Sequence, residues 1–198
     1  MTQQTKPIQK RAHATRAKLI DTAKAVIAVQ GYGAMRVEQV VQQAGVAKGT
    51  FFAHFPDKDA LLDLIVGDEL NLYLYDIEQK STPDDVADFV VQLMPILNFM
   101  AQERYLFDLI IRHSGAAAKE ELGPIARTFD RQIAVLAKWL TIGPFRKDVS
   151  AILLAEGVQA FVIQAIALHF CAVHGDASIQ SRLTIYLEAW LRPQGAPL

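Results

Sequence analysis

Gly45 interrupts a helical pattern after only two turns, and this break limits the fold more than any other feature of the chain. The segment before it, residues 37–44, has one apolar helical face, formed by Val37, Val40, Val41 and Ala44. A second short helix is expected over residues 48–54, because Pro56 stops it. Two short helices joined by a tight glycine-containing turn, with a longer helix before them, predict a three-helix arrangement of the helix-turn-helix type.

Helical spacing also dominates the rest of the chain, and no segment shows convincing strict alternation of apolar and polar side chains. Residues 14–30 carry an apolar stripe that ends at Gly31 and Gly33. Asp57 can cap the long helix that follows the second short one. The further expected helices span residues 58–79, 82–101 with a bend near Pro95, 102–113, 119–140, 148–173 and 177–191. The sequence therefore predicts an all-α protein of about nine helices.

The overall net charge of −1 conceals a basic front part and an acidic body. Residues 1–60 contain nine Lys and Arg against four Asp and Glu, a net charge of +5. The remaining residues contain eleven against seventeen, a net charge of −6. Residues 1–12 are polar and lack an apolar segment, so we expect a flexible basic tail rather than a secretory signal. The basic front part favours an anionic partner at the N-terminus.

Two features favour a soluble protein of the cytoplasm. Cys171 is the only cysteine, so no intrachain disulfide can form, which fits a reducing compartment. Residues 151–174 are apolar enough to raise the question of a membrane span, but polar side chains interrupt them, namely Glu156, Gln159, Gln164 and His169. We therefore expect this segment to be a buried helix of a bundle, with no membrane partner.

The second short helix has two different faces. Phe51 and Phe55 lie four residues apart, so both should pack into the core, while Phe52 faces outward. The outward side also presents Lys48, Gly49, Thr50, Ala53 and His54. A lysine for phosphate, a glycine for close backbone approach and side chains that meet base edges suit a helix in the major groove of DNA. We expect DNA to contact this face, with Lys58 meeting phosphate at a helix start.

The segment GYGAMRVEQVVQQAGVAKGTFFAHFPDKDALL resembles the DNA-binding domain of TetR-family transcriptional regulators. The resemblance implies a TetR-type helix-turn-helix domain over residues 13–73, with its motif at residues 36–55. It also implies a larger helical ligand-binding and dimerisation domain over residues 74–198. The DNA face that it implies consists of Lys48, Gly49, Thr50, Phe52, Ala53, His54 and Lys58.

The sequence departs from the family pattern at three positions. The family commonly has tyrosine at the position of Phe52, so a hydroxyl group for phosphate is missing. It often has a large aromatic residue at the position of Ala53, so contact area is lost. Where Arg36 stands, the family favours a Ser or Thr helix cap; arginine cannot cap in that way, but its guanidinium group can reach phosphate. These departures bear on the operator sequence rather than on the fold.

The last two expected helices are candidates for a subunit contact. The candidate interface residues are Gln159, Leu183, Tyr186, Leu187 and Trp190. A large apolar face on a terminal helix belongs either to ordinary core or to an interface. The resemblance implies a homodimer joined by a four-helix bundle made from the last two helices of each chain. A two-fold dimer would match a palindrome with half-sites roughly 34–36 Å apart.

The middle helices combine apolar side chains with a few polar ones, as small-molecule sites do. The candidate ligand-binding residues are Phe89, Leu93, Phe107, Ile110, His113, Trp139, Phe161 and Gln164. Core residues with satisfied hydrogen bonds would give the same pattern. The resemblance implies a cavity, but it does not name the residues that line it.

Metal binding and catalysis have little support in the sequence. Cys171 and His174 share one side of a helix, but His169 and His174 do not, so three ligands would need an unwound helix end. No nucleophile has an adjacent base. We therefore expect that the protein is not an enzyme and that it binds neither a metal nor a cofactor. We expect a small-molecule effector, whose identity the sequence does not give.

These observations together predict a DNA-binding transcriptional regulator. We interpret the chain as a homodimeric repressor that a small apolar inducer releases from a palindromic double-stranded DNA operator. Within the same class, an activator or a quorum-type regulator is the alternative. In a different class, the alternative is a helical small-molecule-binding protein or enzyme that uses its N-terminal domain for protein contacts.

Overall fold

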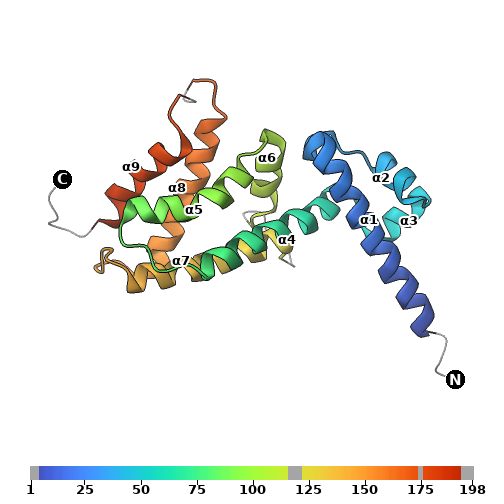
Figure 1. Ribbon diagram of the computed structural model, residues 1–198, viewed down its shortest axis with the longest axis horizontal. Coiled ribbons are helices and arrows are strands. Elements are labelled where there is room, and N and C mark those ends of the chain that lie inside the picture. Colours follow the sequence, from blue (N-terminus) through green and yellow to red (C-terminus); the bar gives the residue numbers. More distant parts are fainter. Residues whose placement is uncertain (1–4, 116–121, 174–175, 193–198) are drawn as a thin grey trace. The chain divides into compact units, whose positions relative to one another are not determined.

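The computed structural model describes residues 5–115, 122–173 and 176–192 (Figure 1). Within these ranges it has nine α-helices and no strand, which confirms the all-α prediction. The chain divides into two compact units, Met1–Val66 and Gly67–Leu198, here called the N-terminal unit and the C-terminal unit. The division falls inside helix α4 (Lys58–Glu78), whereas the sequence suggested a boundary after residue 73.

The N-terminal unit contains α1 (Thr5–Ala34), α2 (Val37–Ala44), α3 (Lys48–His54) and the first part of α4. Helix α1 starts earlier than expected, since residues 5–12, which we assigned to a flexible tail, are helical. The segment is rich in residues that favour helices, and Pro7 lies in the first turn, where the missing N–H is tolerated. Gly31, with φ at 83°, interrupts the helix where the sequence predicted its end.

Apolar stripes of the first three helices form the core of the N-terminal unit, where α1 packs against α2 and α2 against α3. The buried side chains include Leu19, Ala23, Val26, Val40, Val41, Phe51, Phe55, Leu61 and Leu62. Gly45 ends α2 in the left-handed conformation, with φ at 63°, and its N–H donates to the carbonyl of Gln42 at 3.1 Å. This conformation favours glycine, which explains why the break predicted from the sequence occurs at this residue.

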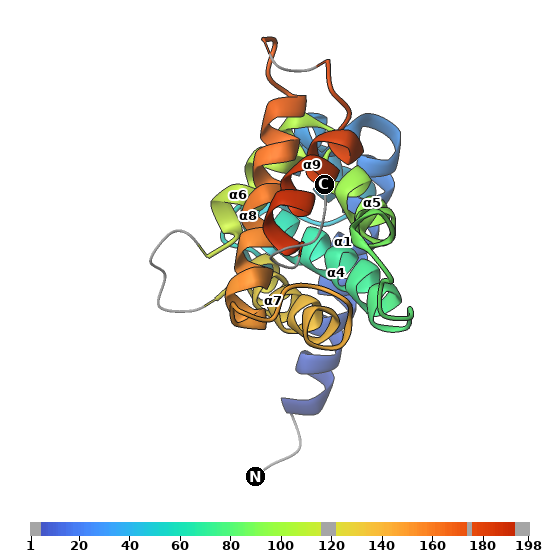
Figure 2. The ribbon, with the colours of Figure 1, turned by 90° about the vertical axis from the view of Figure 1, so that its left-hand side faces the viewer.

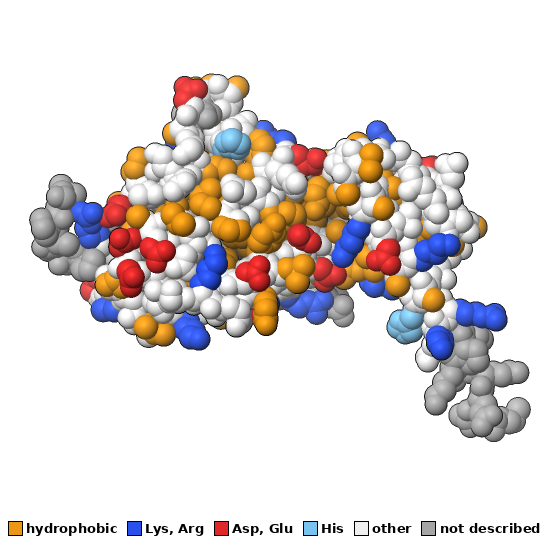
Figure 3. Space-filling model, viewed as in Figure 1, with side chains coloured by type: hydrophobic (Ala, Val, Ile, Leu, Met, Phe, Trp, Pro, Cys, Tyr) orange, Lys and Arg blue, Asp and Glu red, His pale blue; other side chains and the backbone are white. Residues whose placement is uncertain are grey.

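The C-terminal unit is a bundle of the remaining helices. They are α5 (Val86–Met100), α6 (Arg104–His113), α7 (Pro124–Ile142), α8 (Ala151–His169) and α9 (Ile179–Leu191), together with the end of α4. Helix α8 packs against both α7 and α9, and α9 also packs against α5 (Figure 2). On the face shown in Figure 3, hydrophobic side chains gather over the middle of this unit.

Much of the surface of helix α8 is not packed against other helices of this chain. Of the helices in the described ranges, it is the one long and apolar enough to cross a membrane by length and composition. One such helix is weak evidence for a span, since core helices of soluble proteins meet the same criterion. Only 33% of its most apolar stretch is buried inside this chain. Our expectation of a buried helix therefore holds for one side of α8 alone.

Candidate nucleic-acid interface

The three phenylalanines of the α3 region divide as the sequence predicted. Phe51 is fully buried and Phe55 is 3% exposed, whereas Phe52 is 45% exposed. The Phe51 ring lies 5.6 Å from the Phe55 ring and meets the Phe52 ring edge-on at 5.3 Å, measured between ring centroids. The Arg16 guanidinium group from α1 lies over the Phe55 ring at 4.9 Å, a cation–π contact. Two rings thus anchor α3, and the third stays at the surface.

The outer face of α3 is open to a partner. Lys48, Gly49 and Ala53 are exposed, and Thr50 and His54 are half-buried. A Cβ atom added to Gly49 would meet nothing within 4 Å. Packing inside the chain therefore does not require glycine at this helical position, although glycine weakens a helix relative to alanine. A glycine at position 49 would instead allow a binding partner to approach the helix backbone closely.

Lys48 has an ion-pair partner on the neighbouring helix. Its Nζ lies 2.6 Å from Oε1 of Glu38 on α2, and both side chains are more than half exposed. The hydrogen bond from Lys48, followed by one at the backbone of Glu38 itself, lowers the pKa of the Glu38 carboxyl group. The lysine that we assign to phosphate is therefore held beside a carboxylate when DNA is absent.

Arg36 and Lys58, the two outlying cations of the predicted DNA face, occupy helix starts. Arg36 is exposed at the N-cap of α2, and its backbone N–H donates to Gln39 Oε1 at 3.0 Å. Gln39 thus supplies a capping bond that the Arg36 side chain cannot. Lys58 is half-buried and donates to the Gly33 carbonyl at 3.2 Å, which joins the start of α4 to the end of α1. Asp57 caps α4 through the Ala60 N–H at 2.7 Å, as predicted.

Most candidate ligand residues lie inside the C-terminal unit. The buried ones are Phe89, Leu93, Phe107, Ile110 and Trp139, whereas His113 and Phe161 are half-buried and Gln164 is exposed on α8. The Phe89 ring meets Trp139 and Phe145 edge-on, at 5.4 and 5.5 Å. Trp139 also lines a cavity of about 470 Å³ between the end of α4 and α7. The ligand-binding role of these residues stays a prediction.

The candidate interface residues contact their own chain extensively. Leu183 and Leu187 are fully buried, and Trp190 Nε1 donates to the Leu154 carbonyl at 3.1 Å. Gln159 Nε2 donates to Gln132 Oε1 and to the Phe129 carbonyl, each at 3.1 Å, and Tyr186 lies against the Phe161 ring at 5.3 Å. These contacts join α8 to α7 and α9. The two leucines are thus core residues of the unit and offer no surface to a partner.

A different set of apolar side chains is exposed on α8 and α9. Ile152 is 61% exposed, Leu153 is 50% exposed and Ile185 is 66% exposed, and the small residues Ala160, Ala167 and Ala189 are exposed beside them. On α8 the exposed positions repeat every four residues, and apolar Ile152 and Ala160 alternate there with polar Glu156 and Gln164. That spacing was available in the sequence, but it could not show which side of α8 the chain covers.

The residues considered for metal binding form no such site in the described ranges. No group of three or more His, Cys, Asp or Glu side chains there could hold a metal ion. His169 lies against the Phe170 ring, and Cys171 is half-buried. His174 lies outside the described residues.

Comparisons with known proteins agree with this architecture. Residues 19–65 match the family described as "Bacterial regulatory proteins, tetR family". The chain is 28% identical over 100 residues to the uncharacterized HTH-type transcriptional regulator YvdT of Bacillus subtilis, covering 50% of this chain and 52% of that protein. It is 31% identical over 78 residues to the fatty acid metabolism regulator protein of the same organism, covering 37% and 40%. The matches thus span about half the length of these curated relatives or less.

A solved structure extends the similarity to nearly the whole chain. The fold resembles Thermus thermophilus FadR, a TetR-family transcriptional repressor solved in complex with lauroyl-CoA, with a TM-score of 0.65 and 17% identity. The alignment covers 92% of this chain and 99% of that one. An identity of 17% to this structure supports a shared fold. The match of residues 19–65 to the family model concerns the N-terminal DNA-binding domain. Residues 19–65 thus match the DNA-binding domain of TetR-family transcriptional regulators, and the fold of nearly the whole chain is similar to that of a TetR-family repressor.

Proposed function

We propose that this regulator is a homodimeric, cytoplasmic repressor that binds a palindromic operator through α3 and leaves it when a small ligand with an apolar part binds. The observation that carries the proposal is the outer face of α3. It presents Lys48, Gly49 and Phe52 outward over the buried rings of Phe51 and Phe55. An exposed helix with a cation, a bare backbone position and an apolar side chain suits the major groove.

The uncovered face of α8 and α9 supports the dimer. Large exposed apolar side chains such as Ile152 and Ile185 lie on it beside small ones such as Ala160. Small residues allow a second helix to approach closely, and large exposed apolar side chains of this kind favour an association site. A second copy of the chain is the occupant we propose, because one α3 contacts few bases and two-fold symmetry would match a palindrome.

A buried amide group supports ligand binding inside the C-terminal unit. Gln132 on α7 is 4% exposed, and its Nε2 atom has no hydrogen-bond partner among the described residues. A buried donor without a partner is uncommon and costs about 1–3 kcal/mol. A ligand with an acceptor atom would satisfy it. The similar repressor FadR was solved with lauroyl-CoA, a ligand with a long apolar part.

Binding to DNA from the region that flanks the coding sequence of this protein tests the proposal. We expect affinity to fall steeply as salt rises from about 50 to 200 mM, because Lys and Arg contacts to phosphate release counterions. Lys48→Ala should weaken binding and lower the slope of log affinity against log salt by about 1. Thermal stability should hardly change, since the Lys48–Glu38 pair is exposed.

Lys138→Ala is the matched control, because it removes the same charge from an exposed position of α7 in the C-terminal unit. It should bind the duplex as the wild-type protein does. Equal binding by the Lys48 and Lys138 variants, or wild-type binding that does not respond to salt, would contradict the proposal.

A further inference from the structure

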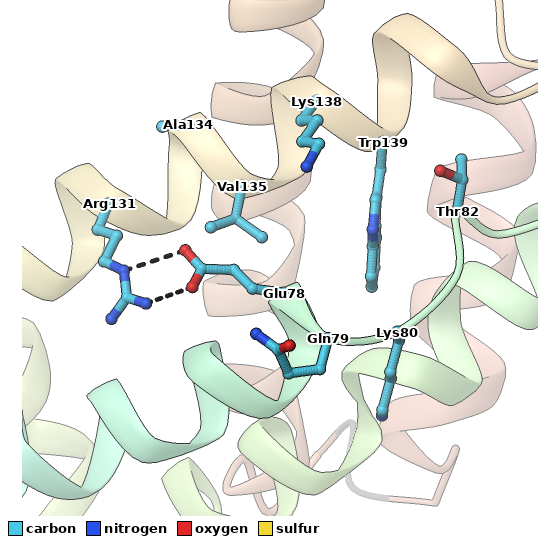
Figure 4. A pocket seen from close by; sticks show the side chains of 9 residues that line it. All are labelled: Glu78, Gln79, Lys80, Thr82, Arg131, Ala134, Val135, Lys138 and Trp139. Carbon is cyan, nitrogen blue, oxygen red and sulfur yellow. Dashed lines mark hydrogen bonds and ion pairs between the residues drawn. The ribbon is translucent and has the colours of Figure 1, made fainter.

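A cavity of the C-terminal unit lies on its surface, between the end of α4 and α7 (Figure 4). It measures about 470 Å³, within the range of small-molecule sites. Glu78, Gln79, Lys80 and Thr82 line it from the end of α4 and the following loop. The α7 side consists of Arg131, Ala134, Val135, Lys138 and Trp139.

The lining is cationic, although the chain after residue 60 is acidic. The one acidic side chain of the lining, Glu78, is already neutralised, because Arg131 donates to both of its carboxylate oxygens (Figure 4). Arg131 also donates to Asn71 Oδ1 at 3.1 Å. The pair is about one-third exposed on each side. This bidentate arrangement leaves the positive charges of Lys80 and Lys138 without a counterion in the lining.

The two lysines remain able to bind an anion. Lys80 donates one hydrogen bond to the Gln92 carbonyl at 3.2 Å, which uses one of its three protons and none of its charge. Lys138 is exposed and makes no hydrogen bond or ion pair with the residues that the structure describes. In Figure 4 the two side chains point to different parts of the lining, and the Lys138 ammonium group, which has no carboxylate partner, favours a carboxylate or phosphate.

Trp139 adds an apolar wall beside these charges. The residue is 4% exposed, and its indole ring stands in the cavity next to Thr82 and below Lys138 in Figure 4. Phe89 supports the ring from within the unit at 5.4 Å, so its orientation is fixed by packing. A fixed indole ring next to an ammonium group suits a ligand that joins an anionic group to a flat apolar one.

We infer that this cavity binds an organic anion with an aromatic or otherwise flat apolar part, and that such an anion is the effector. Its charged group contacts Lys138, and its apolar part contacts Trp139 and Val135. The inference rests on the proposed ligand response and gives the chemical class of the ligand, and it places the ligand in this cavity, whose lining does not include Gln132. Occupancy would also affect α4, because an anion near Arg131 competes with Glu78 for the guanidinium group.

Binding of matched probes to the full-length protein tests this inference. The probes are 1-naphthoate, 1-naphthyl phosphate, neutral 1-naphthamide and inorganic phosphate, each titrated by calorimetry. We expect naphthoate, naphthyl phosphate or both to bind, whereas naphthamide and inorganic phosphate bind at least about tenfold more weakly. The two anionic probes distinguish a carboxylate ligand from a phosphate ligand. Lys138→Gln should weaken the binding of the preferred anion by about tenfold, because it removes a charged donor.

Lys24→Gln is the control, since it makes the same change at an exposed position of α1 and should leave probe binding unchanged. Equal binding of naphthoate and naphthamide, equal binding by the two lysine variants, or no binding of either anionic probe would overturn the inference. Titration of the Lys138→Gln variant with DNA distinguishes a failure of this inference from a failure of the proposed function. If that variant and the wild-type protein both bind DNA while the probes do not bind the cavity, only this inference fails. If the wild-type protein does not bind DNA, the proposed function fails.

Discussion

The ammonium group of Lys48 lies 2.6 Å from the carboxylate of Glu38, so the cation at the start of α3 is paired within the free protein. DNA phosphate must replace Glu38 as the partner of this lysine. The carboxylate also repels phosphate directly. Glu38 should therefore act as an internal competitor that limits the affinity for DNA.

Glu38→Gln should tighten DNA binding several-fold, because it frees Lys48 and removes a negative charge near the duplex. The measurement is fluorescence anisotropy with a labelled duplex at fixed salt. Asp130→Asn, an exposed position of α7, makes the same charge change in the C-terminal unit and should have no effect. Unchanged or weaker binding by the Glu38 variant would show that α2 and α3 are not arranged over DNA as we propose.

The pKa of Glu38 provides a test without DNA. The hydrogen bond from Lys48 lowers this pKa, so the pair stabilises the fold above the ordinary carboxyl range and is lost as the pH falls through the lowered value. In Lys48→Ala the Glu38 pKa should rise toward its ordinary value. Titration of the side-chain carboxyl carbon by NMR measures it. An unchanged pKa would mean that the pair does not persist in solution.

Assembly should depend on the exposed face of α8 and α9. Ile185→Glu should give a folded monomer with much weaker operator binding, since Ile185 is 66% exposed and a buried unpaired charge at an interface is costly. Analytical ultracentrifugation and circular dichroism measure mass and folding. Val29→Glu, at an 87% exposed position of α1, is the control and should leave the mass unchanged. A dimer that survives Ile185→Glu would move the interface elsewhere. Leu187 cannot serve in this test, because a charge at that buried position would unfold the unit.

Gly157 allows α8 and α9 to pack closely. A Cβ atom there would lie 2.5 Å from Cε2 and Nε1 of Trp190. Gly157→Ala should therefore destabilise the protein by about 1–3 kcal/mol in denaturant unfolding, because the indole ring must shift away from the Leu154 carbonyl that it binds. Gly49→Ala, the same substitution at an open site, should not destabilise it. Equal stability of the two variants would contradict the packing described here.

The sequence predicted the features that depend on short-range periodicity. The helical repeat of 3.6 residues was enough to assign Phe51 and Phe55 to the core and Phe52 to the surface. The position of Gly45 was enough to place the turn between α2 and α3. These predictions needed only neighbours within a few positions along the chain.

The relationships that the sequence did not predict join residues far apart. Lys48 meets Glu38 across two helices, and Arg131 meets Glu78 from 53 positions away. Such pairs form only when two helices pack at a particular angle and distance. A single sequence does not give this packing geometry. For Leu187 the sequence left core and interface open, since an apolar stripe has the same pattern whether its own chain or a second copy covers it, and the structure buries this residue in its own chain. The cationic cavity around Lys138 was missed because its lining comes from two separate segments.

The central claim is that the outer face of α3 contacts DNA, and Gly49→Ala tests it most directly. Nothing within 4 Å would meet the added methyl group, so the variant should fold and should be as stable as the wild-type protein or more stable by up to about 1 kcal/mol. On the same duplex we predict an affinity about tenfold lower, equal to about 1.4 kcal/mol, because the methyl group intrudes where the backbone approaches DNA. Wild-type affinity in the Gly49→Ala variant would contradict the account.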